Sequence, residues 1–309
     1  MNGPRMTSTT FSPAIQAFEQ SYAVARARSR MIWGLSTIVF LILFFASAHL
    51  SDFFKVAQVT LADGSRAERW IIPAGLPRLG EYLEKTIPSL QWATLGTDLA
   101  NWFWAWRTWA VLLAETILIA FMATTFGVVG GFVLSFPAAR NLSPNKWVLW
   151  FTRRFLEIAR TVPDLVWALI FVFSFGIGPL AGVLAISLHA MGALGKLYSE
   201  ANENIDMRPL DGIKASGGSW FDMIRYGAVP QVLPNILSYT LLRFEINVRS
   251  SSIIGYVGAG GLGQEFRTAV SFQEYTDLSA LFVIIFVTVM LIDYGSEKLR
   301  HRFIGLGVQ

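Results

Sequence analysis

The sequence predicts an all-α membrane protein with about six transmembrane helices. Of its 309 residues, 53% are hydrophobic and only 15% are charged, whereas a soluble domain carries about 25% charged residues. Long apolar stretches recur from residue 32 to near the C-terminus, as expected for a chain that crosses a bilayer several times. The net charge of the chain is only +4, and its Lys and Arg residues lie between apolar stretches. This pattern is typical of charges that flank membrane helices, not of a nucleic-acid-binding surface.

The N-terminal region, residues 1–31, is predicted to be cytoplasmic and to lie on the inner membrane surface. Ser12-Pro13 marks a helix start, and apolar side chains at helical spacing follow it, so residues 13–30 form an amphipathic helix in this interpretation. The apolar run after it is not followed by a small-residue cleavage site, which argues against a signal peptide.

The predicted spans are six apolar stretches, with residues 32–50 forming the first transmembrane helix. Residues 51–106 form a mixed segment, predicted to be periplasmic, whose tryptophan cluster suits a membrane interface. Residues 107–300 form the transmembrane core, in which the second and fifth spans are the ones expected to be tilted or broken. The spans are predicted at residues 32–48, 109–136, 155–176, 179–198, 232–257 and 278–292.

Loop charge predicts the orientation. With the N-terminus inside, the inner segments hold twice as many Lys and Arg residues as the outer ones, so both termini are predicted to be cytoplasmic. The sequence shows no internal repeat, which favours a subunit that gains its symmetry by pairing with a second copy of itself.

Residues 204–230, between the fourth and fifth spans, are too polar to cross the bilayer and too apolar for a free loop. Pro209 marks a helix start, and apolar side chains alternate with charged ones on both sides of Gly217-Gly218. Because glycine permits a tight bend, the segment is predicted to be a cytoplasmic helix-turn-helix that presents an apolar surface to a partner.

The same segment follows a motif of binding-protein-dependent permeases: Glu-Ala-Ala, three residues, Gly, nine residues, then Ile-x-Leu-Pro. The motif falls here on Asp211, Gly212, Ile213, Gly217 and Pro230. Gly217 and Pro230 match and Asp211 is a conservative departure, whereas Gly212 and Ile213 do not match.

Three further stretches extend the similarity: residues 157–164, 243–250 and 255–265. Together with the cytoplasmic motif they resemble the permease subunits of phosphonate ABC transporters. The resemblance covers about residues 110–300, and the first hundred residues match no motif of that family.

The resemblance implies the type I ABC importer permease architecture, in a multi-pass protein of the bacterial cytoplasmic (inner) membrane. It implies three partners besides the lipid bilayer: a second copy of the chain in a homodimer, a dimer of cytoplasmic ATP-binding subunits, and a periplasmic or lipid-anchored substrate-binding protein. The loop would be the coupling helix that docks on the ATPase. ATP and Mg would be used by that partner and no cofactor bound by this chain, since the sequence has no Walker lysine motif. The substrate would be phosphonate or a related small oxyanion.

Charged residues within the fifth and third spans are the candidates for a translocation pathway, because an ionisable group at membrane depth is costly unless it is paired or faces water. Glu245 and Arg249 have the spacing and order of a same-face pair. Arg243 and Glu245 are two residues apart and cannot share that face, so at least one arginine must point toward another helix or a water-filled path. Glu157, Arg160 and Asp164 repeat this pattern in the third span. The pathway residues are predicted to be Arg249, Glu245, Arg243, Arg160 and Asp164, with Arg249 foremost. Structural ion pairing between helices is the competing interpretation.

The glycine-rich stretch after the fifth span has no strand before it, so a nucleotide-binding loop is not indicated. Its glycines, Gly258, Gly260, Gly261 and Gly263, are predicted to form a tight turn at the outer membrane face. That turn would lie near a bound substrate-binding protein or serve close packing alone.

Catalytic and metal sites are not indicated. The absence of cysteine excludes thiolate ligands and disulfides. His189 is expected to be a satisfied core histidine and not a metal ligand, because the other two histidines lie at opposite membrane faces. The chain is therefore expected not to be an enzyme.

Two rival functions remain open. One is a permease of the same class for phosphate, phosphite or methionine-like substrates. The other is an ion-coupled secondary carrier for a small anion, with Glu157, Asp164 and Glu245 as relays.

Overall fold

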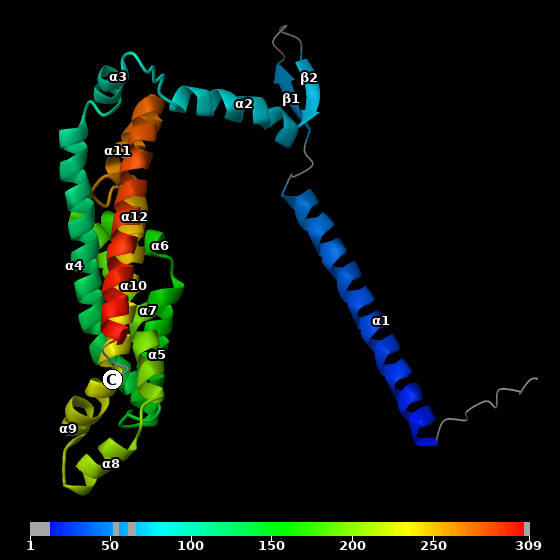
Figure 1. Ribbon diagram of the computed structural model, residues 1–309, viewed down its shortest axis with the longest axis vertical. Helices are drawn as coiled ribbons and strands as arrows, with labels where there is room; N and C mark the ends of the chain where they lie inside the picture. Colours follow the sequence, from blue (N-terminus) through cyan, green and yellow to red (C-terminus); the bar gives the residue numbers. More distant parts are fainter. Residues whose placement is uncertain (1–12, 52–55, 61–65, 306–309) are drawn as a thin grey trace, which may run out of the picture. The chain divides into compact units, whose positions relative to one another are not determined.

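The computed structural model describes the backbone of residues 13–51, 56–60 and 66–305. The chain divides into two compact units, Met1–Leu83 and Glu84–Gln309, whose elements are labelled in Figure 1. The described part is almost entirely helical, as predicted. It departs from an all-α fold only in one antiparallel pair of short strands.

The first unit begins with a single long helix, α1 (Pro13–Leu50). It runs without a break through residues 31 and 32, where the sequence predicted a boundary between a surface helix and the first span. The physical reason is that no proline follows Pro13 in this stretch, so the backbone hydrogen bonds are not interrupted. The portion Tyr22–Leu50 is long and apolar enough to cross a membrane.

The predicted periplasmic segment contains more regular structure than the sequence indicated. Strands β1 (Val56–Thr60) and β2 (Arg66–Trp70) pair in antiparallel register, with Val56 opposite Trp70. Two further helices follow, α2 (Ile71–Thr86) and α3 (Leu95–Trp102).

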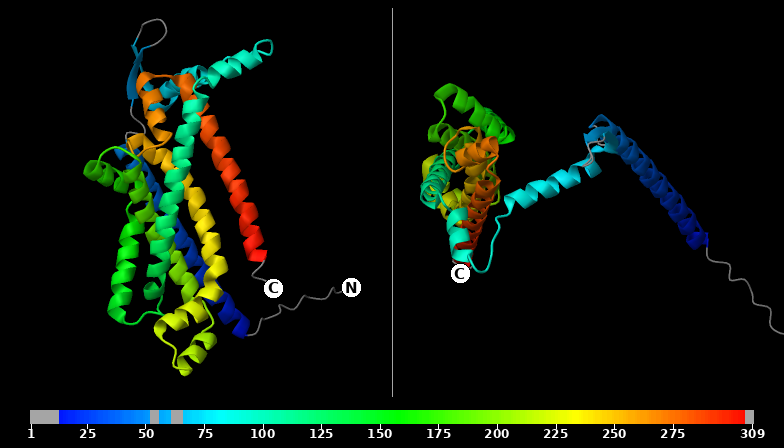
Figure 2. Two further views of the ribbon diagram at one scale, coloured as in Figure 1. Left: turned by 90° about the vertical axis from the view of Figure 1, so that its left-hand side faces the viewer. Right: turned by 90° about the horizontal axis from the view of Figure 1, so that it is seen from above.

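The second unit is a helical bundle. Its long helices are α4 (Trp106–Ala138), α7 (Pro179–Glu203), α10 (Val229–Ile254) and α12 (Tyr275–Gly305). Its shorter elements are α5 (Lys146–Thr161), α6 (Asp164–Phe175), α8 (Arg208–Ala215), α9 (Trp220–Asp222), the π-helix η1 (Met223–Ala228), the 3-10 helix η2 (Gly255–Val257) and α11 (Gly263–Phe272). In both Figure 1 and the left view of Figure 2, α8 and α9 lie at one end of this unit and α3 and α11 at the opposite end.

The most extensive helix contact in the bundle joins α4 to α7, and small residues bring the two helices close. A Cβ added at Gly127 would lie 2.7 Å from the Cβ of Ala190, and one at Gly131 would lie 3.0 Å from the backbone nitrogen of Gly195. Gly127 and Gly131 are four residues apart on one face of α4, the small-xxx-small spacing that lets membrane helices approach closely. Any larger side chain at these positions would separate the two helices.

The number of clearly apolar spans is lower than the six predicted. Among the described residues, four helices are long and apolar enough to cross a membrane, and the bent pair of α5 and α6 makes a possible fifth. Helix α10 occupies the predicted fifth span and is 26 residues long, but it is not in this apolar set. Its polar side chains, Arg243, Glu245 and Arg249 among them, are the reason.

The third predicted span is not one straight helix. Helices α5 and α6 meet at an angle of 89°, and Val162 between them is extended, with φ −72° and ψ 123°. Pro163 explains the break, because it lacks an N–H for the helix ladder and disfavours the helical conformation of the residue before it. By contrast, α4 and α10, which occupy the two spans expected to be tilted or broken, are continuous helices without a break. We call the junction of α5 and α6, residues 159–164, the elbow.

Candidate functional site

The predicted helix-turn-helix is present in residues 204–230, called the coupling loop below. Helix α8 ends in a Schellman motif: the N–H of Gly218 donates to the carbonyl of Ile213 (2.9 Å) and the N–H of Gly217 to that of Lys214 (3.0 Å). Gly217 has φ +84°, in the left-handed region that favours glycine. A Cβ there would meet no atom within 4 Å, so backbone conformation and not lack of space explains this glycine.

The second half of the coupling loop begins with a capping box. The Ser219 hydroxyl and backbone N–H donate to the Asp222 carboxylate at 2.6 and 2.8 Å, while the Ser219 oxygen accepts from the N–H of Asp222. These two hydrogen bonds lower the pKa of Asp222, because both favour its ionised form. The capped turn continues through η1 directly into α10, so the coupling loop and α10 form one continuous backbone path.

The inner face of the coupling loop packs on the rest of the bundle. Leu210 and Ile224 are buried against Phe136 and Leu142, which lie at the end of α4 and just after it. The indole nitrogen of Trp220 also donates to the backbone carbonyl of Leu142 at 2.7 Å. The loop is thus held rigidly on one side.

The outer face of the coupling loop carries exposed aromatic side chains. Phe221 is 75% exposed and Tyr226 is 62% exposed. Of the predicted ATPase-coupling residues, Asp211, Gly212, Gly217 and Pro230 are exposed and Ile213 is partly buried. An exposed apolar surface on a short helix pair is what a protein partner requires, and docking of the ATPase here remains a prediction.

Arg249, the foremost pathway candidate, lies between two carboxylates. Its Nη2 atom is 3.5 Å from Glu245 on its own helix, as the spacing predicted, and 3.8 Å from Asp293 on α12. The sequence did not identify Asp293, since pairing across helices leaves no local signal. Arg249 therefore ties α10 to α12.

Arg243 contacts a different helix from Arg249, and it is only 9% exposed. Its Nη2 lies 2.6 Å from Nδ1 of His189 on α7. Its Nε is buried and has no hydrogen-bond partner in the part of the chain that the structure describes. The other ring nitrogen of His189, Nε2, lies 3.1 Å from the backbone carbonyl of Arg160.

The pairs expected within residues 157–164 do not form. Glu157 and Arg160 keep their helical spacing within α5, but Glu157 pairs with Arg154 instead, at 2.7 Å. The elbow removes the helical spacing between Arg160 and Asp164, and the Asp164 carboxylate accepts from the N–H of Leu165 at 3.0 Å. Arg160 is exposed and has no ion pair within the described part of the chain.

At the elbow, two backbone carbonyls lose their helical hydrogen bonds and accept one from a side chain instead. In a continuous helix the carbonyl of Ala159 would accept from residue 163, but Pro163 has no N–H. The indole nitrogen of Trp167 donates to it instead, at 3.2 Å. His189 serves the carbonyl of Arg160. Inside a membrane such replacement is needed, because an unpaired carbonyl there is costly.

A polar stripe on α10, unnoticed in the sequence, faces the bundle. The Asn247 amide donates to the Thr124 hydroxyl at 2.8 Å, and the Ser251 hydroxyl to the carbonyl of Thr116 at 3.2 Å. Arg243, Asn247 and Ser251 are spaced four residues apart, which was the available signal.

The outer glycine loop is packed inside the unit. Gly258, Gly260 and Gly261 have φ values of +96°, +88° and +72°, so three of the four predicted glycines adopt left-handed backbone. The N–H of Leu262 donates to the Thr116 hydroxyl at 2.8 Å, and a Cβ at Gly263 would lie 2.6 Å from the Cα of Gly255. Close backbone packing accounts for these glycines.

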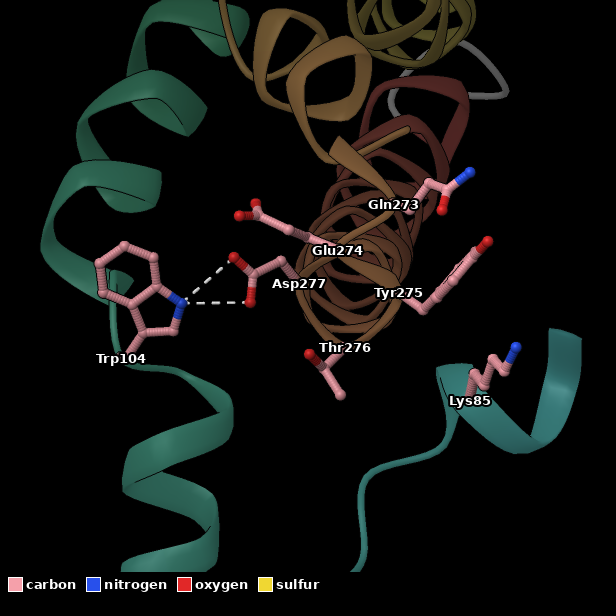
Figure 3. Close-up of a pocket in the computed structure, with 7 residues that line it drawn as sticks. All are labelled: Lys85, Trp104, Gln273, Glu274, Tyr275, Thr276 and Asp277. Carbon is pink, nitrogen blue, oxygen red and sulfur yellow. Dashed lines mark hydrogen bonds between the residues drawn. The ribbon is translucent and has the colours of Figure 1, made fainter. Parts of the chain in front are cut away.

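An open pocket of about 590 Å³ lies at the α11–α12 turn (Figure 3). It is lined by Lys85, Trp104 and residues 273–277. The indole nitrogen of Trp104 lies 3.1 and 3.2 Å from the two carboxylate oxygens of Asp277. Lys85 stands on the opposite side of the pocket in this view. This pocket was not predicted from the sequence.

The coupling loop and the helical bundle that carries it resemble a known family of proteins. Residues 127–294 match the family described as "binding-protein-dependent transport system inner membrane component". The chain belongs to this family. This match confirms the predicted family. Membership implies that the chain is a transport subunit of the inner membrane and not an enzyme.

Among similar members is the phosphite transport system permease protein PtxC of Stutzerimonas stutzeri, 35% identical over 70% of this chain and 78% of that one. Another is the phosphate-import permease protein PhnE of Mycolicibacterium smegmatis, 34% identical over 76% of this chain and 41% of that one.

Solved structures confirm the type I importer fold. The chain aligns with the MetNI methionine ABC transporter in an inward-facing conformation, with a TM-score of 0.54 and 19% identity, over 63% of this chain and 95% of that one. It aligns with an amino acid ABC transporter with a TM-score of 0.52 and 20% identity, over 65% of this chain and 98% of that one. At such identities the likeness concerns the fold alone.

Proposed function

We propose that this permease subunit carries phosphonate or a related small oxyanion. Similarity to members named for phosphite and phosphate supports an oxyanion substrate. The structural observation that carries the proposal is Arg160, an exposed arginine at the elbow between α5 and α6 that has no ion pair among the described residues.

The position of Arg160 argues that it faces water. A charged side chain facing lipid at membrane depth would cost at least about 2.5 kcal/mol, and irregular backbone occurs there only where protein covers it or water reaches it. An arginine also offers paired N–H donors that match a tetrahedral oxyanion. The elbow, which includes Asp164, is therefore our candidate for the pathway lining, together with Arg243. Arg249 and Glu245 are the secondary candidates.

A second copy of the chain completes this pathway in our proposal. One chain leaves the elbow exposed, so a homodimer would enclose the space between two elbows. A dimer of ATP-binding subunits, which use ATP and Mg, would dock on the exposed aromatic face of the coupling loops. A substrate-binding protein would release the oxyanion at the opposite end of the bundle, where α3 and α11 lie (Figure 1).

The substrate class is tested by competition. Cells that contain the chain together with its ATPase and binding protein, and that lack other phosphonate uptake, are given labelled methylphosphonate. We expect excess phosphite or another phosphonate to reduce the accumulated label, and excess D-methionine to leave it unchanged. Uptake of labelled methionine by the same cells, with no uptake of any phosphorus oxyanion, would overturn the proposed substrate.

A further inference from the structure

His189 contacts the side chain of Arg243 and the backbone carbonyl of Arg160. These two partners determine which ring nitrogen of His189 carries a proton. Arginine has only donors, so Nδ1 of His189 must accept the 2.6 Å hydrogen bond from Arg243. A carbonyl only accepts, so Nε2 must carry the proton that it donates to the backbone of Arg160. His189 is therefore a neutral imidazole with its proton on Nε2.

The next turn of α7, at Gly192, packs closely against the backbone of α5 near Arg160. A Cβ added at Gly192 would lie 2.6 Å from the backbone nitrogen of Arg160 and 2.8 Å from the carbonyl of Leu156. Positions 189 and 192 are three residues apart and so share one face of the helix. Gly192 lets the end of α5 approach α7, and His189 then binds the carbonyl at that end.

We propose that His189 is a positioning residue for translocation. Anchored by Arg243, it holds the carbonyl of Arg160 and so fixes the elbow and the direction of the Arg160 side chain toward the passing oxyanion. The inference rests on the proposed function for its link to substrate. Its structural part, the fixed elbow, stands on the hydrogen bonds alone.

A histidine that only fills the core makes a different prediction. An apolar ring of similar size would then replace it at little cost, and the elbow would not change. In our account a side chain that both accepts and donates is required, so glutamine should replace histidine better than phenylalanine does.

The experiment compares His189→Gln with His189→Phe by measuring the elbow directly. Because the chain has no cysteine, spin labels can be placed at Trp147→Cys on α5 and Phe173→Cys on α6, whose native side chains are 73% and 94% exposed. The labelled chain is co-expressed with an excess of cysteine-free chain, so that each complex carries one labelled copy, and the label-to-label distance is measured by double electron–electron resonance.

We expect a narrow distance distribution in the parent chain and in His189→Gln, and a broad one in His189→Phe. Ser187→Ala is the matched control, since its hydroxyl bonds only to the carbonyl of Leu184 in the same helix, and it should give the parent distribution. If His189→Phe does not insert, Arg243→Met removes the anchor and should broaden the distribution in the same way. An unchanged distribution in the inserted variant would overturn the proposal.

Uptake supplies the second readout. In the complete system we expect His189→Phe to lower the maximal rate of methylphosphonate uptake about tenfold, the effect of losing one strong hydrogen bond, with the half-saturating concentration unchanged. His189→Gln should restore most of the rate. Equal rates in both variants would contradict the positioning role. Absence of phosphonate uptake in the parent chain, with the elbow still loosened by His189→Phe, would instead count against the proposed substrate alone.

Discussion

The indole nitrogen of Trp220 donates a 2.7 Å hydrogen bond to the backbone carbonyl of Leu142. This bond joins the coupling loop to the chain segment between α4 and α5. Together with the buried contacts of Leu210 and Ile224, it holds the loop against the end of α4 and the segment that leads into α5. A displacement of the coupling loop by a partner would therefore move α4 and this segment as well.

The first prediction concerns Trp220→Phe, which keeps an aromatic ring but leaves the Leu142 carbonyl unpaired. An unmade hydrogen bond at a buried group costs about 1–3 kcal/mol, so we expect the coupling loop to be held less rigidly against the bundle. The ATPase subunit should still bind, and less substrate should be transported per ATP hydrolysed. Trp92→Phe is the control, because Trp92 is 94% exposed. A normal ratio of transport to hydrolysis in Trp220→Phe would show that this bond carries no coupling.

The second prediction concerns Gly217, whose φ of +84° suits glycine alone. Gly217→Ala should destabilise the loop by about 1–2 kcal/mol through backbone strain, and Gly217→Trp should in addition block docking and abolish transport. Insertion into the membrane should be unaffected in both. Gly295→Ala, at an open helical position in α12, is the control and should transport normally. Wild-type uptake by Gly217→Trp would refute the docking assignment.

The third prediction concerns topology, with the coupling loop inside and α11 outside. Ser271 is exposed in α11, and Ser271→Cys should react with an impermeant thiol reagent in intact spheroplasts. Ser216→Cys, in the coupling loop, should react only in inverted vesicles. Ser216 is preferable to Ser219 for this purpose, because Ser219 caps α9. Labelling of Ser216→Cys from outside would reverse the orientation.

The fourth prediction separates Arg160 from Arg249. Arg160→Ala should reduce uptake strongly while expression and ATPase binding persist, because Arg160 has no ion pair to lose among the described residues. Arg249→Lys should transport normally, since a lysine can still face Glu245 and Asp293, whereas Arg249→Ala leaves two carboxylates unpaired and should lower the yield of assembled complex. Normal uptake by Arg160→Ala together with impaired uptake by well-expressed Arg249→Lys would move the pathway to Arg249.

The coupling loop could be predicted because its signals are local. A proline in the first turn of α8, a pair of glycines after the helix and apolar side chains at helical spacing determine its two helical segments. Gly217 in particular belongs to a turn motif defined within six residues. The family motif depends on the same short spacing, so the sequence was sufficient there.

The elbow could not be predicted in the same way. Val162-Pro163 was visible in the sequence, but membrane helices often tolerate proline. What stabilises the break is the pairing of its carbonyls with Trp167 and His189. The contact of His189 with Arg160 joins residues 29 positions apart, and no local pattern reports such a contact. The pairing of Arg249 with Asp293 escaped prediction for the same reason.

The central claim, that this chain works as the permease of an ATP-driven oxyanion importer, is tested most directly in proteoliposomes. The vesicles contain the chain and its ATPase subunit, with the binding protein and labelled methylphosphonate on the outside and ATP trapped within. We predict accumulation that requires hydrolysable ATP and persists when ionophores remove all ion gradients. Accumulation that continues without ATP and disappears with the ionophores would contradict the account and identify an ion-coupled carrier.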